Sequence, residues 1–168
     1  MLLRHAKSSW EDPLLDDFDR PLAKRGRKAA KRVGAWLRQH EVRPDLVLCS
    51  ESVRTRETLE LILPSLGCEP AITYERRLYL ADADGLLARI QQVADDVRSV
   101  LLIGHNPGMQ ELAVSLTPAT ARNARRRLAE KFPTTALARF RSGAARWSDL
   151  TPDVTKLVSY VRPADLDD

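Results

Sequence analysis

The stretch Leu2-Leu3-Arg4-His5-Ala6-Lys7-Ser8-Ser9-Trp10 opens the chain with an apolar run that ends directly in an arginine and a histidine. Such a run is typical of the end of a buried strand, and open α/β sheets carry their reactive groups at strand ends. His5 could therefore act as a nucleophile, with Arg4 beside it binding an anion. On this stretch alone, a short strand followed by a surface histidine and two ordinary cations is the simpler interpretation. The later segments change that balance.

Length and composition set the class of protein. The chain has 168 residues, of which 43% are hydrophobic and 30% charged, as expected for one soluble globular domain. We therefore expect 1–168 to form a single domain, whose natural start could lie a few residues upstream because the first strand begins almost at Met1. No apolar run is long enough to cross a bilayer, and no signal peptide precedes Arg4. With only two cysteines, Cys49 and Cys68, a reducing cytoplasm is the expected compartment.

The net charge of +4 is unevenly distributed. Much of the excess lies near the start of the chain, in the cluster Lys24–Arg32 and in the run Arg122–Arg127. Scattered cations on helix faces are usually solvated surface, whereas a cleft with several arginines suits anionic ligands.

Helix-like and strand-like segments alternate along the chain. After a polar loop over 8–20, the hydrophobic spacing predicts helices over 21–40, 52–64, 84–93, 109–116 and 123–132. Apolar or alternating runs predict further strands at 45–50, 71–74, 99–104, 135–140 and 154–161. This alternation predicts an α/β fold with a mainly parallel central sheet and helices on both faces.

Helix ends carry their own signals. Pro21 suits the first turn of the first helix. Ser50 and Ser52 can both cap the second helix, and Asp84 can cap the third.

Polar residues of one chemical type follow three of the expected strands. They are Arg4-His5, Arg54 in the first helical turn after the second strand, and His105. Because the carboxyl ends of parallel strands share one edge, two histidines and two arginines converge there if these strands are neighbours. The planar fork of arginine matches phosphate oxygens, a neutral imidazole can attack phosphorus, and Gly104 and Gly108 would let the backbone approach an oxyanion. The set predicts phosphoryl transfer through a phosphohistidine intermediate.

With these segments in place, the sequence resembles the histidine phosphatase (phosphoglycerate mutase-like) superfamily, and is most similar to its small SixA-type phosphohistidine phosphatases. The resemblance spans nearly the whole chain. Its motifs are Leu3-Arg4-His5-Ala6-Lys7-Ser8, Asp17-Phe18-Asp19-Arg20-Pro21-Leu22 with Arg25-Gly26, Cys49-Ser50-Glu51-Ser52-Val53-Arg54-Thr55-Arg56-Glu57-Thr58, Ile103-Gly104-His105-Asn106-Pro107-Gly108, and a late segment, Lys131-Phe132-Pro133-Thr134-Thr135-Ala136.

The resemblance implies a role for each matched residue. His5 would be the nucleophile, Arg4 and Arg54 would clamp the phosphoryl oxygens, and His105 would donate a hydrogen bond to the same group. Ser8 could orient the phosphate loop, although a turn-forming serine explains it equally well. Water would then release inorganic phosphate from phosphorylated His5. The resemblance implies neither a metal nor an organic cofactor.

The general acid is less well defined. Larger relatives use a carboxylate that follows the third strand, where this chain has Glu75, while Asp17 and Asp82 are alternatives. A carboxylate at a strand end often pairs with a surface arginine instead. The resemblance also implies a small form without the helical insertion that narrows the cleft in larger relatives, and hence an open site for a protein-borne phosphate.

Other reactive residues fit competing sites poorly. Cysteine-dependent phosphatases separate Cys and Arg by five residues, but only four lie between Cys49 and Arg54. His40, at a helix end, suits a structural position, and three histidines without close pairing do not suit zinc.

Three functions remain to be compared. The first is hydrolysis of phosphohistidine on a protein, and the second is hydrolysis of a small phosphorylated metabolite in the same fold. The third is non-catalytic nucleic-acid binding through Arg122–Arg127, which no recognised binding motif accompanies. A membrane partner is not expected.

Overall fold

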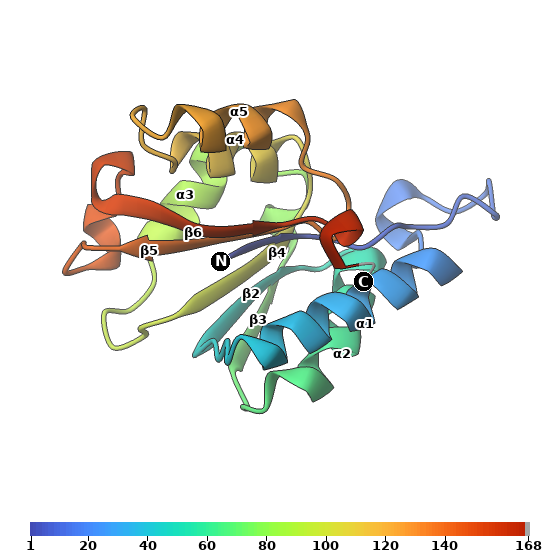
Figure 1. Ribbon diagram of the computed structural model, residues 1–168. Helices are drawn as coiled ribbons and strands as arrows, with labels where there is room; N and C mark the ends of the chain where they lie inside the picture. Colours follow the sequence, from blue (N-terminus) through green and yellow to red (C-terminus); the bar gives the residue numbers. More distant parts are fainter. Residues whose placement is uncertain (167–168) are drawn as a thin grey trace.

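The computed structural model describes residues 1–166 and contains a six-stranded sheet in the order β3-β2-β4-β1-β5-β6 (Figure 1). The strands are β1 (Leu2–Arg4), β2 (Leu46–Ser50), β3 (Ala71–Glu75), β4 (Val100–Gly104), β5 (Leu137–Ser142) and β6 (Thr155–Val161). β1 to β4 run parallel, whereas β5 is antiparallel to β1 and β6 is antiparallel to β5. The predicted mainly parallel α/β sheet is therefore confirmed.

Helices cover both faces of the sheet (Figure 1). They are α1 (Lys24–Gln39), α2 (Val53–Leu66), α3 (Ala83–Gln91), α4 (Gly108–Ser115) and α5 (Arg122–Glu130). Short 3-10 turns lie at η1 (Asp17–Asp19), η2 (Arg76–Leu78), η3 (Trp147–Asp149), η4 (Pro152–Val154) and η5 (Pro163–Leu166).

Alternating strand residues divide the core into two layers. Leu3 and Ile103 belong to the cluster that contains Val33 of α1 and Ile62 of α2. Neighbouring strand residues such as Leu102 point the other way and join the cluster of α3, α4 and α5. Because successive side chains of a strand face opposite sides, the buried runs need helices on both faces.

The helix boundaries differ from the prediction where tertiary contacts intervene. α1 begins at Lys24 rather than at Pro21, because Leu22 pairs in extended conformation with Ser8 and its N–H donates to Glu57 at 2.6 Å. α2 ends near Pro64, as predicted, but it continues through that residue to Leu66, where Gly67 ends the helix with a left-handed φ of 63°.

Two capping predictions were also wrong in detail. Asp82, rather than Asp84, caps α3 by accepting the N–H of Gly85 at 2.8 Å. Ser52 occupies the N-cap position of α2, but its hydroxyl bonds to the Thr55 hydroxyl at 2.8 Å instead of to a helix N–H.

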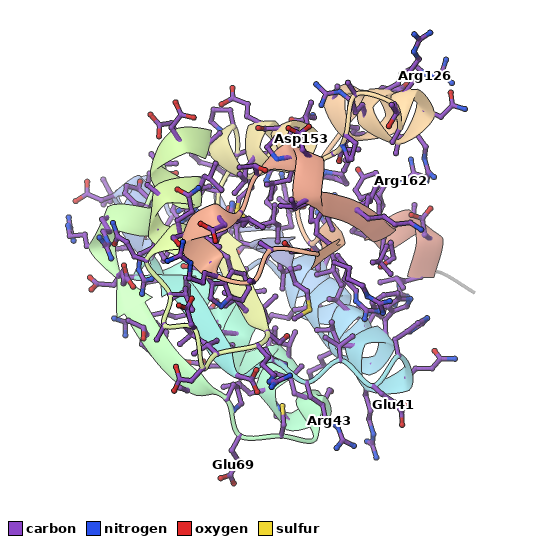
Figure 2. The ribbon with its side chains drawn as sticks, turned by 90° about the vertical axis from the view of Figure 1, so that its left-hand side faces the viewer. Glu41, Arg43, Glu69, Arg126, Asp153 and Arg162 are labelled. Carbon is purple, nitrogen blue, oxygen red and sulfur yellow. The ribbon has the colours of Figure 1, made fainter. Side chains whose placement is uncertain are left out.

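The basic run of α5 is only partly available to a ligand. Arg125 donates to the carbonyls of Val114 at 2.8 Å and Thr117 at 2.6 Å, which closes the end of α4. Arg126, by contrast, projects away from the molecule (Figure 2). Within residues 1–166, no helix has the length and apolar character needed to span a membrane.

Candidate active site

Three neighbouring strands bring the predicted residues together. β2, β4 and β1 are adjacent in the sheet, so the segments that follow them meet at one edge. The rings of His5 and His105 lie 5.1 Å apart between their centroids. Both histidines and Arg54 are buried, which shields their interactions from water.

His5 is held in one orientation by its own backbone turn. Its Nδ1 lies 2.7 Å from the Ala6 carbonyl oxygen, which can only accept, so Nδ1 carries the proton and Nε2 keeps a lone pair. The Ala6 N–H donates to the Thr58 hydroxyl at 3.0 Å. Burial, and then the nearby guanidiniums of Arg54 and Arg4, lower the pKa of His5 to about 3. The imidazole is therefore neutral at physiological pH and has a lone pair with which to attack.

His105 lies against the end of β2. Its Nε2 is 2.9 Å from the Ser50 hydroxyl and 3.4 Å from the Ser52 hydroxyl, while its Nδ1 is buried without a hydrogen-bond partner. Burial, with repulsion from His5 next, lowers the pKa of His105 to about 2. A buried nitrogen without a partner is costly, and a bound oxyanion would satisfy it.

Arg4 is fixed by the segment before β5. Its Nη1 donates to the Phe132 carbonyl at 2.9 Å, which also accepts from the Asn106 side chain at 3.0 Å. The Thr135 N–H donates to the carbonyls of Arg4 and His5. Like His105, Arg4 has a buried nitrogen without a partner, its Nε.

Arg54 projects from the first turn of α2 and is paired with Asp17. Its Nη2 donates to the Asp17 carboxylate at 2.8 Å, and its Nη1 donates to the Asp17 backbone carbonyl. The same carboxylate accepts from Tyr79 at 2.6 Å and from Arg20 at 2.8 Å. These donors outweigh the cost of desolvation and hold the pKa of Asp17 well below its usual range. Asp17 is thus an anion and a poor proton donor.

Glu75 is held by arginines of its own. It forms ion pairs with Arg89 at 2.7 Å and with Arg77 at 2.6 Å. Although partial burial opposes the change, these partners lower the pKa of Glu75. A carboxylate stabilised in its ionised form is poorly suited to general-acid catalysis, which speaks against that predicted role.

The contacts of Ser8, Gly108 and Cys49 show what these three residues do near the site. The Ser8 hydroxyl accepts from Arg20 at 2.7 Å, which favours a role in fixing the loop. A side chain at Gly108 would collide with the Ala81 carbonyl, with its Cβ 2.0 Å from that oxygen. Gly108 therefore allows close packing rather than the predicted approach to an oxyanion. Burial raises the pKa of the Cys49 thiol to about 12, so Cys49 is not an activated nucleophile.

Several neighbours of the site were not predicted from the sequence. Tyr79, Asn106 and Thr135 were given no role, although Tyr79 packs edge-on against His105 with ring centroids 5.2 Å apart. The one available signal was their place in the motif segments or just after Glu75. Across residues 1–166, no group of three or more His, Cys, Asp or Glu side chains could hold a metal ion.

Comparisons with known proteins identify the family. The family model described as the histidine phosphatase superfamily (branch 1) matches residues 1–79. An uncharacterised protein of Mycobacterium tuberculosis is 37% identical over 163 residues, a match that covers 96% of this chain and 99% of that protein. The chain belongs to the histidine phosphatase superfamily.

Solved structures relate this histidine phosphatase to SixA proteins. A candidate SixA phosphohistidine phosphatase of Nakamurella multipartitia is 29% identical, with a TM-score of 0.81 over 96% of this chain and 95% of that chain. The protein histidine phosphatase SixA, solved with tungstate, is 23% identical and shares the fold, with a TM-score of 0.80 over 99% of this chain and 97% of that chain. The predicted small phosphoglycerate mutase-like fold is confirmed, and the chain is a phosphatase of this superfamily.

Proposed function

We propose that this histidine phosphatase hydrolyses phosphohistidine on a protein, with His5 as the nucleophile. The observation that carries the proposal is a neutral imidazole beside carboxylates that are held ionised. The free Nε2 of His5 supports attack on phosphorus, while Asp17 and Glu75 are both paired with arginines.

The first half-reaction transfers the phosphoryl group to His5. The Nε2 lone pair forms a bond to phosphorus as the bond between phosphorus and the substrate nitrogen breaks. The second nitrogen of the substrate ring takes a proton from solvent before the bond breaks, so the ring leaves as neutral imidazole with the bonding electron pair. The His5 ring becomes positively charged, and its Nδ1–H bond to the Ala6 carbonyl, at 2.7 Å, stabilises that charge.

The phosphoryl oxygens would meet the donors that surround His5. Arg4 Nε and His105 Nδ1 are buried and without partners, and Arg54 adds a second positive charge to that of Arg4. Positioned cations stabilise the charge that is spread over the equatorial oxygens during transfer. In the second half-reaction, a water oxygen bonds to phosphorus, the bond to Nε2 breaks, and inorganic phosphate leaves.

The ionised carboxylates favour a phosphoramidate over an alkyl phosphate ester. An alkoxide is a poor leaving group unless an acid protonates it, whereas an imidazole leaves readily once its second nitrogen is protonated. The free thiols of Cys49 and Cys68 fit the reducing cytoplasm that we propose as the compartment.

The test compares substrates and histidine variants. Wild-type protein is expected to release phosphate from a phosphohistidine peptide much faster than from a phosphoserine peptide or a panel of phosphorylated metabolites. His5→Ala should abolish the activity, while His40→Ala, which alters an exposed histidine at the C-cap of α1, should leave it unchanged. A metabolite that is hydrolysed faster than the phosphohistidine peptide would replace the proposed substrate, and full activity in His5→Ala would overturn the mechanism.

A further inference from the structure

The loop between β1 and α1 exposes large apolar side chains beside the candidate active site. Leu14 is 92% exposed, Trp10 71% and Leu15 39%. Figure 1 shows this segment projecting beyond the sheet edge at which β1 ends. Leu80, 53% exposed, adjoins Tyr79, whose ring contacts Phe18 at the base of the loop. Exposed leucines gathered at a functional site are typical of a surface that another molecule covers.

The base of this loop is fixed to the phosphate-binding residues. Asp17 binds Arg54, and Phe18 packs edge-on against Tyr79 with ring centroids 4.9 Å apart. Arg20 stacks on Trp10, with its guanidinium carbon 3.2 Å from the ring centroid. A loop that is already ordered loses little conformational entropy when it binds a partner.

The charge of the loop is opposite to that of the whole chain. Segment 9–20 contains five acidic residues and one arginine, in a protein of net charge +4. Asp17 is used at the site, but Glu11, Asp12, Asp16 and Asp19 are exposed, and none of them has an ion-pair partner in the part of the chain that the structure describes. The exposed leucines are therefore bordered by carboxylates that form no ion pair, and such groups complement lysine and arginine side chains.

The depth of the site determines what touches this loop. His5 is only 6% exposed, so a phosphohistidine side chain must reach below the protein surface before its phosphorus meets Nε2. A histidine side chain is short, and the protein surface around it must come close to the rim. We propose that Trp10, Leu14, Leu15 and Leu80, with the acidic residues around them, form a docking surface for the substrate protein. That protein presents its phosphohistidine beside apolar residues that are bordered by lysine or arginine.

This inference rests on the proposed function and can be tested with three probes. They are free phosphohistidine, a helical phosphohistidine peptide with leucine and lysine at the flanking positions, and a matched peptide with serine and glutamate there. The leucine and lysine peptide is expected to have a kcat/KM about tenfold higher than its matched peptide. Most of the difference should lie in KM, because docking adds binding without changing the reacting atoms.

The loop variant Leu14→Ser with Leu15→Ser should remove this preference and leave the rate on free phosphohistidine unchanged. The control is Val154→Ser with Val158→Ser, which replaces two exposed valines, one just before the edge strand β6 and one within it. This variant should keep the preference. Equal kcat/KM for the two peptides, or an unchanged preference in the loop variant, would overturn the docking surface. If none of the three probes is hydrolysed, the proposed function itself is overturned instead.

Discussion

At the scale of single residues, the Nδ1–H bond of His5 to the Ala6 carbonyl determines which nitrogen can react. The 2.7 Å contact assigns the proton to Nδ1 and leaves Nε2 as the nucleophile. Without it, the tautomer would be free and the reactive nitrogen could turn away from phosphorus. The low pKa of about 3 keeps that nitrogen unprotonated.

Asp17 positions Arg54 and also competes with the substrate for it. In Asp17→Asn, loss of a negative charge beside the site should tighten inhibition by inorganic phosphate about fivefold. The kcat should fall about tenfold, because Arg54 loses the carboxylate that orients it. Steady-state kinetics with phosphate as inhibitor measures both effects. The control is Asp19→Asn, which changes an exposed neighbouring acid and should alter neither the phosphate inhibition nor kcat. Weaker phosphate binding in Asp17→Asn would contradict the role given to Asp17.

Glu75 is expected to stabilise the fold without taking part in the chemistry. Glu75→Gln should keep kcat within about twofold of wild type, because the ionised carboxylate supplies no proton. It should lower the free energy of unfolding by about 1 kcal/mol through the weakened, partly buried pair with Arg89. Denaturant melts and kinetics on the same preparation separate the two effects. A large loss of kcat at unchanged stability would restore Glu75 as the acid.

Sequence reasoning located the four central residues because each follows a strand. Arg4, His5, Arg54 and His105 occupy positions that a parallel sheet necessarily brings to one edge. Tyr79 could not be found in this way, since it lies in an irregular segment whose packing depends on the whole fold. Asp17 was considered only as a proton donor, because two of its partners, Arg54 and Tyr79, come from distant parts of the chain.

At the scale of elements, the packing of α1 on the segment after β1 holds the phosphate loop. A Cβ at Gly26 would lie 2.1 Å from the Lys7 carbonyl oxygen, so only glycine permits this approach. Gly26→Ala should therefore destabilise the protein by at least about 2 kcal/mol and lower its activity. Thermal unfolding together with kinetics measures both.

The matched control for this substitution is Gly143→Ala. The nearest atom to a Cβ there is the Val154 carbonyl oxygen at 3.8 Å, an ordinary contact. Gly143→Ala should change stability by less than about 0.5 kcal/mol. If the two alanine variants unfold at the same temperature, the close approach at Gly26 does not constrain the loop.

The elements themselves followed from hydrophobic periodicity, while several of their ends did not. Buried strands such as β4 are short apolar runs, and the helices repeat their apolar residues at helical spacing. The start of α1 depended on the pairing of Leu22 with Ser8, and the end of α2 on burial of Leu66 beyond Pro64. Such contacts join residues distant in sequence and leave no local signal.

At the scale of the whole molecule, two buried neutral histidines make the fold sensitive to acid. The pKa of His5 is about 3 when folded, against about 6.5 in an unfolded chain, so the unfolded state binds more protons between these values. Stability should fall as the pH falls below about 6.5, by about 2 kcal/mol at pH 5 for His5 alone. Urea melts in phosphate-free buffer at pH 7 and pH 5 measure this loss.

His5→Gln removes the titrating group and should therefore abolish that part of the acid sensitivity. His40→Gln, which alters an exposed histidine, should keep the full acid sensitivity. Equal losses of stability between pH 7 and pH 5 in wild type and His5→Gln would show that His5 is not buried in its neutral form.

The most direct test of the central claim is phosphorus NMR of the trapped phosphoenzyme. Rapid reaction with excess phosphohistidine peptide, followed by alkaline denaturation, preserves a phosphoryl group on histidine, and the chemical shift distinguishes the two ring nitrogens. We expect a single phosphohistidine at His5, substituted on Nε2 and missing in His5→Ala. A phosphoryl group on Nδ1, or on any other residue, would contradict it.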